Sequence, residues 1–261
     1  SLHMLAIATV LAGVLGILLY GVLLPQVLRE HDLTQYFRPG MFSIEYRRLF
    51  RFCMPVFAAD MAIALRVVLV ILALEHFHNF TNVAEYRAVM PIARLNNVVL
   101  VNFSLLFLPL ASKLFAQKNT ALLGEIQSHV TLWVTVLSYP VFAACISLSE
   151  PLTVLLLGER YSSAAPLLAI LAVGYFFQAA LGLNRQSLRA LGKVRILLYI
   201  EIVATIIAVI TALILVPKFG AIGAAIATTA TVILYSILNT IAWWRFTGDN
   251  PLPWVYARVY L

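Results

Sequence analysis

The chain has 261 residues, of which 62% are hydrophobic and 11% are charged, whereas only about half of the residues of an ordinary globular domain are apolar and about a quarter are charged. This composition excludes an ordinary water-soluble protein and places the chain in a lipid bilayer. The formal net charge of +7 does not indicate a partner of nucleic acid, because the basic residues cluster in loops between apolar runs rather than on a soluble face.

Apolar runs of about 20 residues recur along the whole chain, and each is long enough to cross a hydrocarbon core about 30 Å thick. They predict an all-α integral membrane protein, because the alternating segments typical of a transmembrane β-barrel are absent from the sequence. Prolines fall inside several runs and predict kinked helices. We expect about seven transmembrane helices, one outlying helix and a six-helix bundle, at residues 3–24, 52–75, 84–110, 127–149, 164–184, 196–216 and 221–244.

A short basic segment, "MFSIEYRRLFR" at residues 41–51, follows the first span, and its apolar side chains are interleaved with arginines. We expect it to lie in the cytoplasmic interface and to connect the outlying helix to the bundle. The predicted organisation is therefore a first helix with its connector (1–51), a six-helix transmembrane lobe (52–246) and a cytoplasmic tail (247–261).

The third predicted span includes "YRAVMPIARLNNVVLVNF" (86–103), an apolar run that carries two arginines, a proline and three asparagines. An arginine at the bilayer centre costs about 2.5–3.5 kcal/mol on insertion scales, so such residues should face protein or water. Arg66 in the second span and Arg94 in the antiparallel third span each lie about 21–22 Å from the cytoplasmic end, at 1.5 Å per residue, and hence at one depth. Arg87 precedes Arg94 by two helical turns on the same face and is long enough to reach the outer interface.

These arginines predict a ladder of cations on a cavity wall, with guanidinium groups suited to hold a diphosphate in a bidentate manner. The alternative is an ion pair between helices, for which Asp60 and Glu201 supply the carboxylates. Asp60 is about 9 Å along the helix from Arg66 and on another face, so the two do not form a same-face pair. Asp60 and Glu201 are also the candidates for ion coupling.

Three amides within the spans are candidates for hydrogen bonds to a sugar: Asn97, Asn102 and Gln178. Hydrogen bonding between helices is the more common role of such residues in a membrane. Their assignment to substrate binding is therefore a hypothesis that depends on where the helices place them.

Catalytic and metal-binding motifs are absent from the sequence. The two histidines of "EHFHNF" (75–80) are more typical of a hairpin loop than of a metal site. No nucleophile elbow, phosphate loop or zinc motif occurs, and short outer loops leave no room for an active-site domain. We expect a protein that is not an enzyme and that requires no cofactor or metal.

The basic residues predict the orientation in the membrane. Of 18 lysines and arginines, thirteen lie in loops on one side, two (Arg160 and Lys218) lie on the other, and three lie within spans. The positive-inside rule makes the first side cytoplasmic. We expect a multi-pass protein of the inner (plasma) membrane with its C-terminus in the cytoplasm.

Four segments carry a resemblance to a known family: "RFCMPVFAAD", "VAEYRAVMPIARLNNVVLVNFSLLFLPLASKLF", "LLLGERYSSAAPLLAILAVGYFFQAALGLNRQSLRALGKVRI" and "LVPKFGAIGAAIATTATVILYSIL". Over about residues 45–245 the chain resembles the C-terminal half of polysaccharide flippases, the O-antigen and exopolysaccharide exporters of the MOP superfamily. That superfamily also contains the lipid II flippases and the MATE antiporters. The resemblance implies two six-helix lobes that face a central cavity, of which residues 52–246 would be the second lobe.

By this resemblance, the expected function is a flippase that moves a polyprenyl-diphosphate-linked oligosaccharide from the cytoplasmic to the outer leaflet by alternating access. Its expected partners are the lipid-linked oligosaccharide, the bilayer and a missing N-terminal six-helix lobe, so that the chain would be a C-terminal fragment without activity of its own. The alternatives are a MATE-like cation antiporter, in which buried carboxylates would dominate, and a membrane-embedded glycan ligase or polymerase, which would need a large outer loop.

Overall fold

The computed structural model describes residues 2–30 and 46–247, and helices and turns are the only secondary structure in these two ranges. The chain divides into two units, Ser1–Leu49 and Phe50–Leu261. In the first, α1 (Leu2–Glu30) contains Pro25, and its large apolar side chains between Val10 and Leu23 are exposed. A helix that is apolar on all sides is typical of a membrane span.

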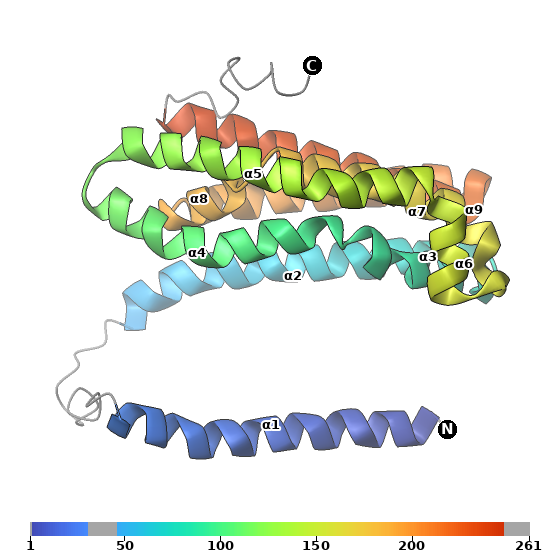
Figure 1. The fold of residues 1–261 in the computed structure, drawn as a ribbon, viewed down its shortest axis with the longest axis horizontal. Helices are drawn as coiled ribbons and strands as arrows, with labels where there is room; N and C mark the ends of the chain where they lie inside the picture. Colours follow the sequence, from blue (N-terminus) through green and yellow to red (C-terminus); the bar gives the residue numbers. More distant parts are fainter. Residues whose placement is uncertain (1, 31–45, 248–261) are drawn as a thin grey trace. The chain divides into compact units, whose positions relative to one another are not determined.

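The boundary between the units falls near the start of α2 (Tyr46–Phe77), which is 32 residues long, contains Pro55 and belongs mostly to the second unit. The predicted connector at 41–51 lies partly outside the described residues, and from residue 46 onward it forms the first turns of α2 rather than a separate segment. The division at 51 and the tail at 247–261 stay predictions. The other elements are α3 (Phe80–Ala93), α4 (Asn96–Ala116), α5 (Thr120–Ser147), α6 (Ser149–Leu157), the 3-10 helix η2 (Glu159–Ala164), α7 (Ala165–Ala180), α8 (Asn184–Ala190) and α9 (Val194–Thr247) (Figure 1).

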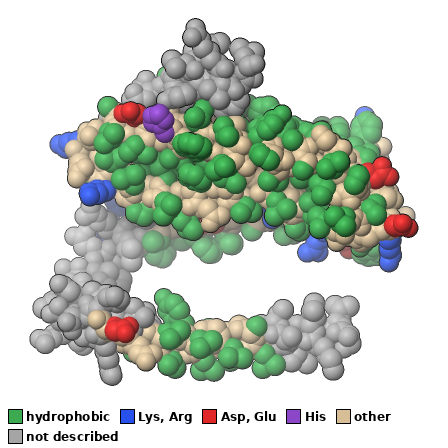
Figure 2. Space-filling view, in the orientation of Figure 1, with side chains coloured by type: hydrophobic (Ala, Val, Ile, Leu, Met, Phe, Trp, Pro, Cys, Tyr) green, Lys and Arg blue, Asp and Glu red, His purple; other side chains and the backbone are tan. Residues whose placement is uncertain are grey.

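Five helical stretches of the described residues are long and apolar enough to cross a membrane: Cys53–Phe77, Asn96–Ala116, Ala121–Ser147, Glu159–Ala180 and Val194–Phe246. On one face of the second unit, hydrophobic side chains cover the middle and most charged side chains lie toward the two ends (Figure 2). An apolar belt between polar ends is what a bilayer requires. The predicted all-α integral membrane fold is confirmed, whereas its orientation stays a prediction.

The last two predicted spans form one antiparallel hairpin within α9. Gly220 has non-helical angles (φ 57°, ψ −132°), a conformation that glycine adopts without the steric penalty of a side chain. The part of α9 before it (orange) and the part after it (red) run in opposite directions (Figure 1). Helix carbonyls near such an end lack an intrahelical donor, and the Val216 carbonyl lies 2.8 Å from Nε2 of His78. His78, in the loop between α2 and α3, therefore stabilises this hairpin. No group of three potential metal ligands occurs among the described residues.

The third predicted span, 84–110, is not one continuous helix. Pro91 lacks the N–H that would bond to the preceding turn, and α3 ends shortly after it at Ala93. The chain then makes a tight turn, in which the Leu95 N–H bonds to the Ile92 carbonyl at 3.1 Å and the Asn97 N–H bonds to the Arg94 carbonyl at 2.8 Å. The expected kink is therefore a break between two helices, and it lies at Arg94.

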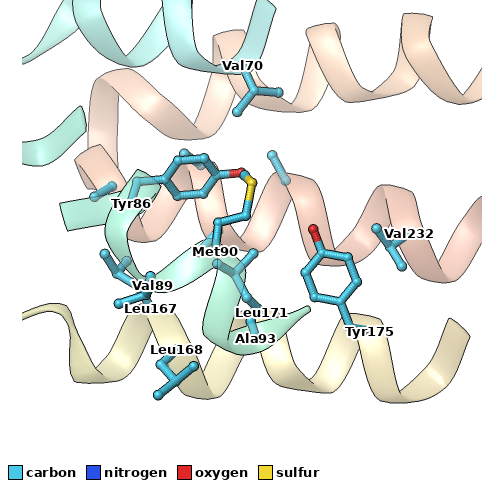
Figure 3. Close-up of a cluster of buried hydrophobic side chains, with 14 of the residues drawn as sticks. Val70, Tyr86, Val89, Met90, Ala93, Leu167, Leu168, Leu171, Tyr175 and Val232 are labelled. Atoms are coloured by element: carbon cyan, nitrogen blue, oxygen red, sulfur yellow. The ribbon is translucent and has the colours of Figure 1, made fainter. Parts of the chain in front are cut away.

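The main apolar core lies among α3, α7 and α9, where Tyr86, Val89, Leu168, Leu171 and Tyr175 are buried (Figure 3). The helices approach closely through small residues. A Cβ atom on Gly174 of α7 would stand 3.0 Å from the Thr229 Cα of α9, and one on Gly182 would stand next to the Thr131 side chain of α5. We call these two contacts the small-residue seam, which is a common way of packing helices in a bilayer.

Candidate functional site

A cavity of about 260 Å³ lies within the second unit, with walls from α2, α3, α4, α7, α8 and α9. Apolar side chains such as Val70, Met90 and Val232 line part of it. Its other lining side chains are polar or charged: Arg66, Tyr86, Arg94, Asn97, Tyr175, Gln178, Arg185, Glu201, Thr228, Thr231 and Tyr235. A polar cavity inside an apolar belt is the usual location of a transport site.

Arg66 lines the cavity as an ion pair. Its Nη1 donates to Oε2 of Glu201 at 3.2 Å, and the two side chains are only 12% and 2% exposed. Its guanidinium carbon also stands 5.3 Å from the ring centroid of Tyr235, which is within the range of a cation–π contact. Arg66 therefore forms the ion pair between helices that was the alternative to a role in the cavity, and it also lines the cavity.

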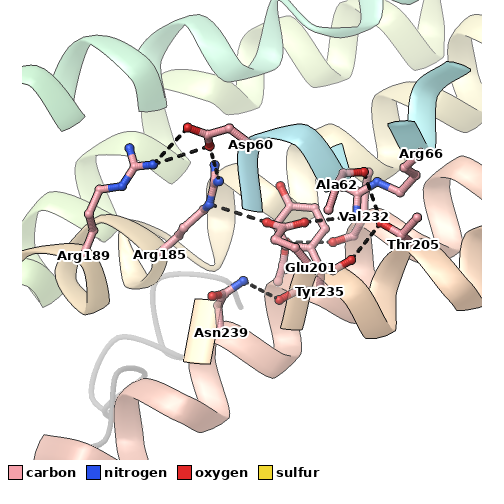
Figure 4. A network of polar contacts seen from close by, with 11 residues as sticks. Asp60, Ala62, Arg66, Arg185, Arg189, Glu201, Thr205, Val232, Tyr235 and Asn239 are labelled. Carbon is pink, nitrogen blue, oxygen red and sulfur yellow. Dashed lines mark hydrogen bonds and ion pairs between the residues drawn. The ribbon is translucent and has the colours of Figure 1, made fainter. Parts of the chain in front are cut away.

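Glu201 and Asp60 belong to one chain of charges (Figure 4). The other oxygen of Glu201 lies 3.5 Å from Nε of Arg185, and Nη2 of Arg185 donates to Oδ1 of Asp60 at 3.1 Å. Arg189 closes the chain at 3.3 Å from Oδ2 of Asp60. We call Arg66, Glu201, Arg185, Asp60 and Arg189 the ion-pair network. It links α2 to α8 and α9, and Asp60 does not pair with Arg66, as the sequence predicts.

Arg94 lines the same cavity in a different way. It is the C-cap of α3, a position where a cation is favoured by the helix dipole. Its Nε donates to the hydroxyl of Tyr175 at 3.0 Å, and its guanidinium carbon stands 5.9 Å from the Tyr175 ring centroid. Among the residues that the structure describes, no carboxylate forms an ion pair with it.

Two of the three predicted sugar-binding amides contact one another. Nδ2 of Asn97 donates to Oε1 of Gln178 at 2.9 Å, so the interhelical role expected of such residues is present here. Both side chains line the cavity. Oδ1 of Asn97 is buried without a hydrogen-bond partner in the described part of the chain, and it is therefore an acceptor that a ligand hydroxyl would satisfy.

The structure does not bring Arg87 or Asn102 to this cavity. Arg87 is exposed on α3 and is absent from the lining, although its neighbour Tyr86 is part of it, so Arg87 lies on a face of α3 that does not border the cavity. Asn102 is exposed on α4, where its Nδ2 donates to the Val98 carbonyl at 2.8 Å. An amide that bonds to its own helix in this way needs no partner from a ligand.

Sequence reasoning missed Thr228, Thr231 and four larger polar residues of the cavity lining. Arg185 is in a basic segment that the charge count assigns to a cytoplasmic loop, yet the short α8 brings it to Glu201. The other three are tyrosines: Tyr86, Tyr175 and Tyr235. Tyr86 is 1% exposed, and its hydroxyl lies 2.7 Å from Oγ1 of Thr228. The available signal for all three was an aromatic residue with a polar tip inside an apolar span, where a buried hydroxyl needs a partner.

The lining of the cavity carries excess positive charge. The lining contains three arginines, Arg66, Arg94 and Arg185, and one carboxylate, Glu201. In a low-dielectric surrounding, such an excess favours an anionic ligand over a cationic one.

Comparison with known proteins gives two matches. The model of the MatE family matches residues 55–214. An uncharacterized membrane protein of Methanocaldococcus jannaschii is 27% identical over 158 residues, which cover 60% of this chain and 31% of that relative. The chain thus spans about a third of the length of the curated relative that it matches. No solved structure matches it significantly.

The family match covers more than half of the chain and runs from α2 into α9. It includes Arg66, Arg94, Arg185 and Glu201 of the cavity. Proteins of this family are transporters rather than enzymes, in agreement with the absence of catalytic motifs from the sequence. The chain therefore belongs to the MatE family, a family of membrane transporters within the MOP superfamily, and it is a multi-pass membrane protein.

Proposed function

We propose that this lobe binds the diphosphate group of a polyprenyl-linked oligosaccharide and takes part in moving it from the cytoplasmic to the outer leaflet of the plasma membrane. The observation that carries the proposal is the charge of the cavity. Arg94 is a guanidinium without a carboxylate partner among the described residues, in a lining where arginines outnumber acids. Guanidinium groups are the side chains best matched to phosphate oxygens.

The amides add support for a glycan. Asn97 follows Arg94 by one helical turn, and its unpartnered Oδ1 lies beside Gln178. A ligand that carries hydroxyl groups next to its diphosphate would satisfy Arg94 and Asn97 together. The cavity of about 260 Å³ is a suitable size for a diphosphate with part of the first sugar, but not for a whole oligosaccharide.

Transport by alternating access requires two bundles that rock about a site between them. We therefore propose that this lobe works with a second six-helix lobe and that the cavity forms one wall of the shared site. The predicted cytoplasmic location of the C-terminus belongs to the same proposal.

A cation antiporter of the same superfamily is the competing function, and the buried Glu201 is the residue that would favour it. Glu201 is already held by Arg66 and Arg185, so its charge is compensated. A comparison of the affinities for an anionic and a cationic ligand decides between the two functions. We expect the purified chain in detergent to bind farnesyl diphosphate, measured by isothermal titration calorimetry, and to bind neither farnesol nor the lipophilic cation tetraphenylphosphonium with comparable affinity.

Arg94→Gln should weaken the binding of farnesyl diphosphate by about ten- to a hundredfold, because hydrogen bonds to charged groups contribute about 1.5–3 kcal/mol. Arg94→Lys should retain part of the affinity, since lysine keeps the charge and loses the fork. Arg87→Gln is the matched control, because Arg87 is exposed on the same helix outside the cavity. Tighter binding of the cation than of the diphosphate would establish the antiporter instead.

A further inference from the structure

The cavity contains two arginine–tyrosine pairs that differ in how the guanidinium is held. In each pair the guanidinium carbon stands near the face of a ring, at 5.3 Å for Arg66 and Tyr235 and at 5.9 Å for Arg94 and Tyr175. The rings are alike as cation–π partners. The difference lies in which nitrogen of each guanidinium is occupied.

Arg66 uses a terminal nitrogen. Its Nη1 donates to Glu201, so one arm of its fork is occupied and its charge is compensated by a carboxylate that is itself 2% exposed. An incoming anion would have to compete with Glu201 for this group. Arg66 is therefore suited to holding α2 against α9.

Arg94 uses its inner nitrogen. Nε donates to the Tyr175 hydroxyl at 3.0 Å, and this bond leaves both terminal amino groups for another acceptor. Those two groups form the fork that binds a phosphate in a bidentate manner. A guanidinium that is held at Nε and supported by a ring loses less conformational freedom when the ligand arrives.

A second hydrogen bond between the same two segments, from Asn97 to Gln178, helps to fix the position of Arg94. Three residues farther along each element, Asn97 of α4 donates to Gln178 of α7. Together with the bond from Arg94 to Tyr175, it forms two parallel connections between the break in the third span and α7. The backbone around Arg94, which is no longer part of a continuous helix, is in this way held against a rigid neighbour.

We propose that Tyr175 is a positioning residue for ligand binding: its hydroxyl holds Arg94 by Nε so that the two terminal amino groups present an open fork to the anionic group of the ligand. The inference rests on the proposed function, because it assumes that Arg94 is the contact to that anion. Tyr235, which stacks on Arg66 and forms no hydrogen bond to it among the described contacts, provides the matched control.

The experiment compares Tyr175→Phe with Tyr235→Phe, each of which removes one hydroxyl and keeps the ring. The binding of farnesyl diphosphate to the purified chain is measured by isothermal titration calorimetry, and the thermal midpoint of each variant is recorded as a control for folding. We expect Tyr175→Phe to raise the dissociation constant by about three- to tenfold, which corresponds to a hydrogen bond of ordinary strength. Tyr235→Phe removes a hydroxyl of the same lining that does not hold Arg94, so any change it makes in the dissociation constant should be equal with and without Arg94→Gln.

A double-mutant cycle separates positioning from packing. If Tyr175 acts through Arg94, Tyr175→Phe has no further effect once Arg94→Gln is present. An equal loss in both backgrounds, or wild-type affinity in Tyr175→Phe alone, would overturn the inference and leave the proposed function standing. Wild-type affinity in Arg94→Gln, or binding of farnesyl diphosphate no tighter than that of farnesol, would instead overturn the proposed function and this inference with it.

Discussion

The small-residue seam and the ion-pair network hold the same bundle together in opposite ways. At the seam, α7 and the turn that follows it run close to α9 and α5, because Gly174 and Gly182 have no side chains to separate the backbones. The backbone of α2 stays farther from its neighbours, and arginines and carboxylates reach across the space between them. In a bilayer, where apolar side chains gain nothing by leaving lipid for protein, these are the two available ways of joining helices.

The difference separates a rigid part of the lobe from an accessible part. A seam without side chains leaves no room for a ligand, whereas the network borders the cavity that contains Arg66, Arg94 and Glu201. Charged side chains can exchange one partner for another, while a backbone that leaves no room even for a Cβ atom cannot. The cavity and the seam thus share α7 and α9 but use different positions along these helices.

The largest effect is expected from leaving a buried charge without its partner. Arg66→Leu leaves Glu201, at 2% exposure, with only the longer contact to Arg185. Breaking a buried ion pair on one side costs about 3–5 kcal/mol of stability. Unfolding of the purified protein, titrated with sodium dodecyl sulfate, measures the loss.

The control for this variant is the double substitution Arg66→Leu with Glu201→Leu. Replacing both members of a buried pair with apolar residues is often close to neutral, so most of the stability should return. Full stability of Arg66→Leu alone would show that the network contributes little to holding α2 in place.

A smaller loss is expected at the seam. Gly174→Ala puts a Cβ atom 3.0 Å from the backbone of Thr229, which can yield only if α7 and α9 separate. Overpacking of this kind costs about 1–3 kcal/mol. Gly13→Ala in α1 is the control, because among the described residues a Cβ atom on Gly13 has nothing within 4 Å and alanine favours a helix. Equal unfolding curves for the two variants would mean that α7 and α9 are not in close contact.

The smallest effect is expected at the exposed end of the network. Asp60, whose side chain is 49% exposed, pairs with Arg185 and Arg189, and exposed pairs contribute about 1 kcal/mol or less. Asp60→Asn should therefore lower stability only slightly, and added salt should reduce the difference from the unmodified protein. A loss as large as that of Arg66→Leu would show that the whole network acts as one unit.

The sequence predicts the all-helical membrane fold because each span depends on a local property, a run of apolar residues of membrane length, but it does not show that the third span is two helices. It also places Arg66 and Arg94 at one depth, since residue counting along two antiparallel helices requires only the rise per residue. Both residues do line one cavity.

The features that sequence reasoning missed depend on contacts between distant segments. Pro91 predicts a kink, but it does not predict that the helix breaks at Arg94. The residues on both sides of this break, Arg94 and Asn97, are hydrogen-bonded to α7. Counting basic residues cannot show that Arg185 turns back from a loop to Glu201. The same-face argument for Arg87 assumes one helix that runs through Arg94, whereas α3 ends at Ala93 and the cavity is lined by Tyr86 instead of Arg87. The side chain of Asn102 returns to its own backbone, which spacing does not reveal.

The hairpin in α9 bears on how this protein is made. Its two arms, on either side of Gly220, are each about 40 Å long at 1.5 Å per residue, and no loop long enough to be translocated separately lies between them. Because the turn is this tight, the second arm lies against the first as soon as it is synthesised, as the close approach of Gly223 to the Leu215 carbonyl shows. We therefore expect the two arms to leave the insertion machinery together, as one folded unit. His78, which is synthesised earlier, is then available to contact the Val216 carbonyl at the turn.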